Sequence, residues 1–339
     1  MVYYYGIYIG NSTVSIAAYR DDGKVEIVAN EAGDRVTPAV ITLTHKEKVV
    51  GSAASVSSYS LSSLTVRNNK TLLDNDISED SLSRAISKSL VKIHRAEDGQ
   101  LTYTIYETDA KPLLITPTQV ATTVFSKLHG IAIGASPGQS SVSCVICVPR
   151  HWSEVSRKNV AEAAKEAGWK VLQIINQSPA ALLAYRIGFE KPPVDLITLV
   201  YRLGGVSCDA TVIKLEGGLQ TIVGYVYSDT IGGKQMSNVV CKHLAEEFRR
   251  KYHLDPTESR KSMWKLMNAA EAILHTLSTL PSCSRFIESV CEGVDLNATV
   301  SRARLESLIG SLLPLFTQPI FDALEQANIE AEDISKMTF

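Results

Sequence analysis

The sequence has 339 residues, and its 34 Lys and Arg against 36 Asp and Glu leave a formal net charge of -2. This balance, without a run of five or six like charges, argues against DNA or RNA as the main partner. The N-terminus lacks the features of a signal peptide and no segment has about 18 consecutive apolar residues, so we expect neither export nor a membrane anchor. Six scattered cysteines are typical of reduced thiols in a cytosolic protein.

Strands and turns are expected over the first forty residues. The pattern predicts strands over 3–9, 14–19 and 25–29, with a tight turn at Gly10-Asn11-Ser12. Residues from about 40 to 116 contain Ser-rich and polar stretches. We therefore expect a less regular subdomain, inserted into a stronger frame.

Helices and strands alternate after this segment. Pro117 begins a predicted helix, and a buried strand over 142–148 follows it. A helix over 153–167, a strand over 171–175 and a helix from Pro179 to Tyr185 come next. Cys144 and Cys147 form a Cys-x-x-Cys motif, but residues three apart on a strand face opposite sides, so we expect no redox or metal site there.

A second series of strand, glycine turn and strand begins near Leu196. Strands are expected over 196–201, 210–215 and 220–227, and helices over 238–252, 262–280 and 302–327. The repetition predicts an α/β protein of two related lobes, 1–190 and 191–339, with a helical subdomain over about 232–304 in the second. Residues 336–339 are expected to form a strand, with no later segment to pair with it or continue it. We therefore expect a C-terminally truncated chain and an incomplete second lobe.

Three glycine-containing turns attract attention as candidate phosphate loops. Small residues there leave the backbone N–H groups free to surround anionic oxygens. The turns are Gly10-Asn11-Ser12, Gly204-Gly205-Val206-Ser207 and Gly232-Gly233. One such turn is a weak signal, but two that open the two lobes favour a nucleotide held in a cleft between them.

The same segments resemble the ATPase region of the seventy-kilodalton heat-shock family, over almost the whole chain. The resemblance lies in the segments 6–12, 30–39, 148–149, 174–181, 203–207 and 301–304. It implies a two-lobed actin-like ATPase fold, with ribonuclease H-like sheets and flanking helices. Segments 35–40, 181–185 and 277–280 look most similar to the ribosome-associated branch, in which the protein works with a J-domain partner near the exit tunnel.

The resemblance also places four altered residues at the family's catalytic positions. Tyr8 stands where a carboxylate positions Mg²⁺ through water, and Asn69 where a lysine touches the γ-phosphate. Gln177 replaces a glutamate that orients metal and water, and Arg202 replaces the aspartate of the second loop. Because phosphoryl transfer depends on positioning and charge, we expect negligible turnover.

Other positions of the resemblance are kept. Lys70 and Asp209 are possible substitutes for the lost groups, and the family's adenosine pocket retains Glu271 and Ser278. The residues expected to contact nucleotide are Gly10, Asn11, Ser12, Gly204, Gly205, Ser207, Gly232, Gly233, Glu271 and Ser278. We expect ATP or ADP to bind weakly or not at all, and no secure Mg²⁺ site.

The function expected from this resemblance is that of a non-catalytic or weakly catalytic chaperone subunit in the cytosol. It would act with a J-domain co-chaperone on nascent chains at the ribosome, without a peptide-binding domain in this chain. An active ATP-dependent chaperone that uses Lys70 and Asp209 is the alternative. A sugar or acetate kinase of the same architecture is a third possibility, disfavoured by the chaperone-like segments 176–185 and 301–304.

Overall fold

The computed structural model describes residues 4–20, 22–58, 61–96, 99–107, 111–136, 138, 141–188 and 194–339. Tyr3 and Asp21, expected in the first strand and the turn after the second, lie outside these ranges. The chain divides into two compact units. Unit 1 contains residues 1–200, 211–225 and 332–338, and unit 2 contains 201–210, 226–331 and 339. The lobe boundaries expected at 190/191 stay a prediction.

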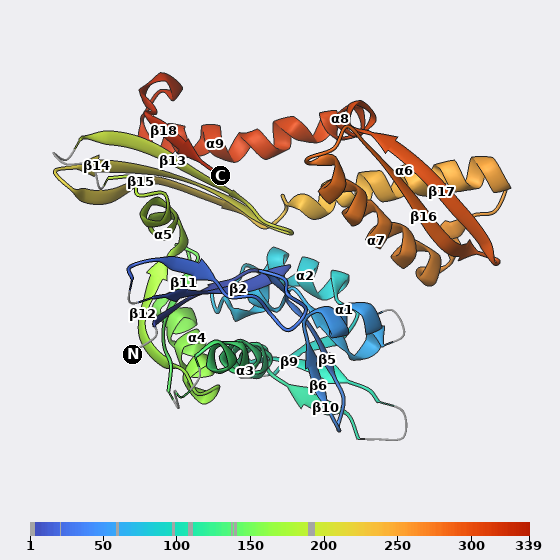
Figure 1. The fold of residues 1–339 in the computed structure, drawn as a ribbon, viewed down its shortest axis with the longest axis horizontal. Coiled ribbons are helices and arrows are strands. Elements are labelled where there is room, and N and C mark those ends of the chain that lie inside the picture. The colour runs from blue at the N-terminus through green and yellow to red at the C-terminus, as the bar shows by residue number, and fades with distance from the viewer. Residues whose placement is uncertain are drawn as a thin grey trace. The chain divides into compact units, whose positions relative to one another are not determined.

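A mixed sheet forms the frame of unit 1 (Figure 1). Its order is β12-β11-β1-β2-β3, with β4 beside β2. The strands are β1 Tyr4–Ile9, β2 Thr13–Tyr19, β3 Val25–Ile27, β4 Thr37–Pro38, β11 Ser143–Val148 and β12 Lys170–Asn176. β1 is the central strand, antiparallel to β2 and parallel to β11. A tight turn at Gly10 therefore connects β1 to β2, whereas a long crossover separates β2 from β11 in the chain. The strands expected over 14–19, 142–148 and 171–175 are confirmed to within one residue, whereas the one expected over 25–29 ends at Ile27 and β4 was not predicted.

Helices α3 (Pro117–Ala135) and α4 (Glu154–Glu166) cover one face of this sheet (Figure 1). Thr116 caps α3 through a capping box with Gln119, and Pro117 occupies the first turn, which explains why the helix begins there. Alternate residues of β1 are buried against these helices. Helix α5 (Gln177–Ala184) begins two residues before the predicted start.

The segment expected to be irregular contains two small sheets. One has the order β6-β5-β7 and the other β10-β9-β8. Its elements are β5 Val40–Leu43, β6 Lys48–Val50, α1 Ser52–Ser57, η1 Ser62–Leu64, β7 Thr65–Arg67, η2 Asn69–Leu73, α2 Glu79–Lys88, β8 Lys92–Arg95, β9 Leu101–Ile105 and β10 Leu113–Ile115. The subdomain is therefore more regular than its Ser-rich composition indicates.

A four-stranded sheet has the order β15-β14-β13-β18, and its residues are divided between the two units. The strands are β13 Leu196–Leu203, β14 Cys208–Glu216, β15 Leu219–Ser228 and β18 Lys336–Thr338. The strand expected at 336–339 is present as β18, and it pairs in parallel with an earlier strand, with Leu199 of β13 opposite Met337.

Unit 2 also contains a helical layer with a long β-hairpin (Figure 1). Its elements are α6 Gly233–Tyr252, η3 Pro256–Glu258, α7 Arg260–Leu277, β16 Ser282–Cys291, β17 Val294–Ser301, α8 Arg302–Ile309, η4 Gly310–Leu312, α9 Leu313–Ala327 and η5 Ala331–Asp333. The hairpin β16–β17 shares a buried core with α6 and α7. The subdomain expected to be helical over about 232–304 therefore also contains a β-hairpin, which the sequence analysis did not predict.

The stretch from Arg302 to Ala327 is one helix by prediction but three pieces in the structure. It is long and apolar enough to cross a membrane by length and composition alone, with 22% of its most apolar window buried. Core helices of soluble proteins pass the same test. Phe316 and Leu324 of α9 are buried, and the Tyr201 hydroxyl donates to the Phe316 carbonyl at 2.6 Å, so this helix is attached to unit 2.

Candidate functional site

The first candidate phosphate loop closes the β1–β2 hairpin. The N–H of Gly10 donates to the carbonyl oxygen of Thr13 at 2.9 Å. A Cβ on Gly10 would lie 2.5 Å from this oxygen, so glycine is required by the close approach of the backbone. Asn11 Oδ1 accepts hydrogen bonds from the N–H and the hydroxyl of Thr71, both at 3.1 Å. The loop is thereby fixed to η2.

The second loop, between β13 and β14, closes in the same way. The N–H of Gly204 donates to the carbonyl oxygen of Ser207 at 2.8 Å, three residues further on. A Cβ on Gly204 would lie 3.0 Å from that oxygen. The two loops thus share a glycine N–H bonded to the carbonyl at position i+3, as the repeated sequence pattern indicates. The loops belong to different units, and their common use around one nucleotide stays a prediction.

The third glycine turn supports the second loop. Gly232 is the N-cap of α6, and the N–H groups of Gly233 and Lys234 donate to the carbonyl oxygens of Gly204 and Gly205, at 2.9 and 2.8 Å. A Cβ on Gly232 would lie 2.6 Å from the Cα of Val206. These two donors at the helix N-terminus are therefore bonded within unit 2. A phosphate contact by this turn stays a prediction.

Tyr8 packs against the first loop. A Cβ on Gly10 would lie 3.1 Å from Cε1 of the Tyr8 ring. The Lys70 ammonium lies over the same ring, 5.9 Å from its centroid, which is within the range of a cation–π interaction. An aromatic ring and an ammonium therefore meet at the position where the resemblance implies a carboxylate.

Asn69 is engaged at both ends of its side-chain amide. Its Nδ2 donates to the carbonyl oxygen of Pro117 at 2.9 Å, and its Oδ1 accepts from the Tyr103 hydroxyl at 3.0 Å. All three groups are in the interior, and burial raises the pKa of the Tyr103 phenol above its ordinary range. Asn69 thus joins η2 to α3 and β9. Sequence reasoning missed Tyr103, because no local pattern connects two residues 34 positions apart.

Gln177 lies at the beginning of α5 and is 8% exposed. Among the residues that the structure describes, neither Oε1 nor Nε2 of this side chain has a hydrogen-bond partner. An amide cannot reproduce the charge of the glutamate that the resemblance implies here. The neighbouring Ser178 bonds to Thr211 through their hydroxyls at 2.7 Å, which fixes the start of the helix.

Arg202 and Asp209 form a partly buried ion pair beside the second loop. The guanidinium donates to Oδ1 of Asp209, and Asp209 is 3% exposed. Nη1 of Arg202 would lie 3.1 Å from a Cβ on Gly204, so the cation lies against the loop. The Asp209 carboxylate is therefore neutralised by Arg202, the residue that stands where the resemblance implies the aspartate of the second loop.

This set of side chains does not fit Mg²⁺. The ion prefers carboxylate, phosphate and water oxygens in octahedral geometry. Tyr8, Gln177 and Arg202 provide no carboxylate, and the Asp209 carboxylate is bonded to a cation. Within the described part of the chain, no cluster of three or more His, Cys, Asp and Glu suited to a metal ion occurs.

The two residues expected in an adenosine pocket lie on α7 (Glu271) and at its C-cap (Ser278). Glu271 and Ser278 are exposed and seven positions apart, which places them on one side of the helix. Ser278 is the C-cap, and its hydroxyl donates to the carbonyl oxygen of His275 at 2.6 Å. Their role toward adenosine stays a prediction.

Cys144 and Cys147 of β11 are free thiols. Burial raises the pKa of Cys144 to about 12 and that of Cys147 to about 11. Both therefore remain protonated at neutral pH, which makes them poor nucleophiles and poor metal ligands.

The sequence matches the family described as Hsp70 protein over residues 4–339. The chain belongs to the Hsp70 family. Its sheets and helices fit the actin-like ATPase fold of the Hsp70 nucleotide-binding domain, which confirms the fold inferred from the sequence. Members of the Hsp70 family generally bind ATP or ADP with Mg²⁺ and work with J-domain co-chaperones.

Relatives of this Hsp70 chain include heat shock 70 kDa protein 14 of several vertebrates. The Mus musculus protein is 36% identical over 332 residues, which cover 98% of this chain and 64% of the relative. The Xenopus tropicalis protein is 36% identical over 333 residues, 98% of this chain and 65% of the relative. The chain therefore spans less than two thirds of the length of these relatives.

Proposed function

We propose that this chain is a non-hydrolysing or very weakly hydrolysing Hsp70 subunit that serves as a binding platform in a chaperone complex. The observation that carries the proposal is the ion pair between Arg202 and Asp209. Arg202 stands where the resemblance implies an aspartate, and its guanidinium neutralises the Asp209 carboxylate. Both changes count against an ATPase and so support a platform. The ring of Tyr8 against Gly10 supports the same conclusion at the first loop.

The expected loss of rate is large. Loss of one preorganised electrostatic group typically lowers kcat by about 10²–10³-fold. Several losses together are not additive, but they leave little transition-state stabilisation. Weak binding of ATP or ADP is compatible with this proposal, because the two glycine loops retain the same closure.

The alternative is an active ATP-dependent chaperone in which Lys70 and Asp209 replace the lost groups. Two observations count against it. Lys70 is buried and its ammonium lies over the Tyr8 ring, and the Asp209 carboxylate is bonded to Arg202. Neither group is thus placed as a free substitute.

We further propose that the platform acts in the cytosol with a J-domain co-chaperone, on nascent chains at the ribosome. The support is the general partnership of Hsp70 proteins with J-domain proteins, together with the likeness of segments 35–40, 181–185 and 277–280 to the ribosome-associated branch. The near-neutral net charge favours binding through a protein partner over direct RNA contact.

Two measurements test the proposal. Calorimetric titration of the chain with MgATP and with ADP measures nucleotide binding, and a thermal melt checks it, because a ligand bound only to the folded state raises Tm. Sedimentation of the chain mixed with a purified ribosome-associated J-domain protein measures the complex. We expect a stoichiometric complex that forms with or without ATP. Separate sedimentation of the two proteins under both conditions would overturn the platform role.

A further inference from the structure

Three titratable side chains of unit 1 lie in series, with His151 in the middle. His151 follows β11, and its Nδ1 lies 2.9 Å from the Tyr225 hydroxyl of β15. Its Nε2 lies 3.5 Å from Oδ2 of Asp74, the residue that ends η2. The side chains of His151 and Asp74 are 22% and 13% exposed, so the series is partly shielded from water. A phenol, an imidazole and a carboxylate thus have the order of a nucleophile, its base and the group that orients the base.

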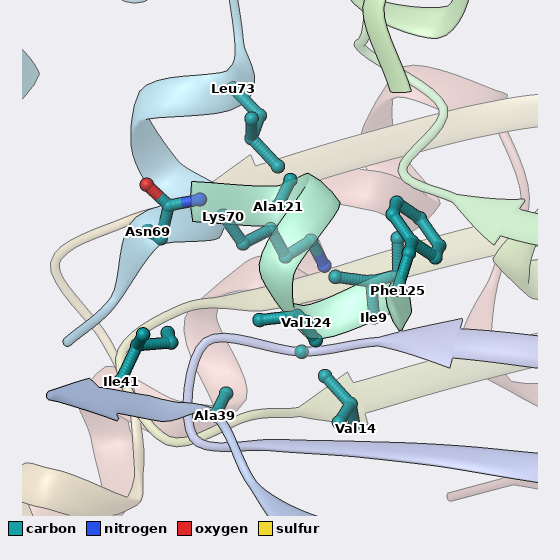
Figure 2. Close-up of a pocket in the computed structure, with 11 residues that line it drawn as sticks. Ile9, Val14, Ala39, Ile41, Asn69, Lys70, Leu73, Ala121, Val124 and Phe125 are labelled. Atoms are coloured by element: carbon teal, nitrogen blue, oxygen red, sulfur yellow. The ribbon is translucent and has the colours of Figure 1, made fainter. Parts of the chain in front are cut away.

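Asp74 is held in place by the elements around it. Leu73, immediately before it, is buried and points toward α3, where it lines a small pocket (Figure 2). Oδ1 of Asp74 accepts hydrogen bonds from the N–H of Asp76 at 3.2 Å and from the hydroxyl of Ser156 at 3.3 Å. Because these donors occupy Oδ1, Oδ2 is the oxygen that meets His151.

The Asp74 carboxylate determines which nitrogen of His151 carries the proton. An ionised carboxylate only accepts hydrogen bonds, so the neutral imidazole favours the proton on Nε2, on the side of Asp74. Nδ1 then presents its lone pair to the Tyr225 hydroxyl, which donates to it at 2.9 Å. In this tautomer the imidazole is placed to take the phenolic proton as a base.

The charges around the series favour negative charge on the phenol oxygen. Arg150 precedes His151, and Glu154 and Arg157 belong to α4. Burial lowers the pKa of Arg157, whereas attraction to Glu154 and to Tyr225 raises it. The Arg157 guanidinium is therefore close enough to Tyr225 to stabilise a developing phenolate.

We propose that Tyr225 is a nucleophile that accepts an acyl group from an activated ester or thioester. The Tyr225 oxygen forms a bond to the acyl carbonyl carbon, and the bond from that carbon to the leaving oxygen or sulfur breaks. The phenolic proton passes to Nδ1 of His151 and from there to the leaving group, while Asp74 acts as a positioning residue. The inference does not depend on nucleotide binding, because all three residues belong to unit 1 and no phosphate or metal takes part.

Acetylation by p-nitrophenyl acetate tests the proposal on the wild-type chain. Peptide mass spectrometry after short exposures measures the rate at each tyrosine. Tyr106 is the internal reference, because it is 54% exposed whereas Tyr225 is half-buried, so exposure alone predicts faster acetylation of Tyr106. We expect Tyr225 to react about tenfold or more faster, since a positioned base typically contributes about 10²–10⁴-fold. Acetylation of Tyr225 no faster than that of Tyr106 would overturn the proposal.

A substitution of the base separates its role from that of the surroundings. His151→Gln keeps a polar side chain but cannot take the proton, and we expect acetylation of Tyr225 to slow about tenfold or more, with the rate at Tyr106 unchanged. His94→Gln, at an exposed histidine of β8, is the matched control and should react like the wild type. A wild-type rate at Tyr225 in His151→Gln would contradict the role of the imidazole.

The pH profile tests the positioning role of Asp74. With a neutral imidazole as base, the wild-type rate at Tyr225 should be level over about pH 8–9, between the ordinary pKa values of histidine and tyrosine. Asp74→Asn presents an amide that can donate to Nε2 and so favours the wrong tautomer. Its rate at Tyr225 should be lower and rise about tenfold per pH unit, as the free phenolate does.

Asp76→Asn is the matched control for this substitution, because Asp76 is exposed and contacts Asp74 through its backbone N–H. It should keep the level profile and the rate of the wild type. A wild-type rate at Tyr225 that itself rises tenfold per pH unit over this range would show an unassisted phenol and overturn the proposal.

Discussion

The Arg202 guanidinium donates a hydrogen bond to the Asp209 carboxylate, and the two side chains are only 18% and 4% exposed. Each charge offsets the desolvation of the other. Removal of one partner leaves the other charge uncompensated in the interior, which costs more than the pair itself contributes. The pair therefore stabilises the second loop, and it occupies the carboxylate that remains there.

Substitution of Arg202 should destabilise unit 2. Arg202→Met leaves the Asp209 carboxylate buried without this cation, and we expect the free energy of unfolding to fall by about 2–4 kcal/mol. Urea denaturation followed by circular dichroism measures it. The control is Arg20→Met, which breaks a surface pair with Glu26 whose side chains are 57% and 53% exposed, and should change stability by less than about 1 kcal/mol. Similar effects of both substitutions would contradict the buried role of Arg202.

The two glycines of β1 and its loop should respond differently to a methyl group. Gly10→Ala places a Cβ 2.5 Å from the Thr13 carbonyl oxygen, whereas a Cβ on Gly6 meets nothing within 4 Å. We expect Gly10→Ala to lower the stability by about 2 kcal/mol or more, because the backbone must shift. Gly6→Ala should be neutral or slightly stabilising in a strand. Thermal melts of both variants test this, and an equal Tm for the two would contradict the tight closure of the loop.

The hydrogen bond between Tyr103 and Asn69 should contribute measurably to folding. Tyr103→Phe leaves the buried Asn69 Oδ1 without this donor, and we expect a loss of about 1–2 kcal/mol. Tyr106→Phe is the control, because Tyr106 is 54% exposed. Guanidinium denaturation gives both values. A neutral Tyr103→Phe variant would contradict the contribution of this hydrogen bond to folding.

Asp74 should make stability depend on pH. Burial raises the pKa of this carboxyl above its ordinary value of 3.8, so the folded state holds the proton at pH values where the unfolded state has released it. Stability from this group therefore falls as pH rises from 3.8 through the folded-state pKa. Asp74→Asn cannot ionise, so its stability relative to the wild type should increase over this window.

Urea denaturation across that pH window measures the difference between Asp74→Asn and the wild type. A constant difference across the window would contradict the effect of burial on the Asp74 carboxyl.

Local patterns predicted the first half of the fold well. The apolar spacing after Pro117 and the alternation in β1 and β11 lie within single elements, so the sequence shows them directly. The strand β17 also alternates, with Leu296, Ala298 and Val300 buried. Because helices were expected on both sides of this segment, the alternation was not interpreted as a strand. The pairing of β18 with β13 joins residues 138 positions apart, and no local pattern reveals it.

The candidate site was predictable only in part. The glycine closures follow from the residue types, and the structure finds them at both Gly10 and Gly204. The packing of Lys70 on Tyr8 and the pairing of Arg202 with Asp209 depend on side-chain directions that spacing does not specify. The resemblance therefore identifies the altered positions, but not what the substituted residues do.

Phosphate release from MgATP by the purified chain tests the central claim most directly. It is measured beside the Lys70→Ala variant and a protein-free control. The account predicts release by the wild-type chain at the rate of the protein-free control, whether or not calorimetry detects bound nucleotide. Mg²⁺-dependent release that Lys70→Ala abolishes would contradict it and establish an ATPase with substitute residues.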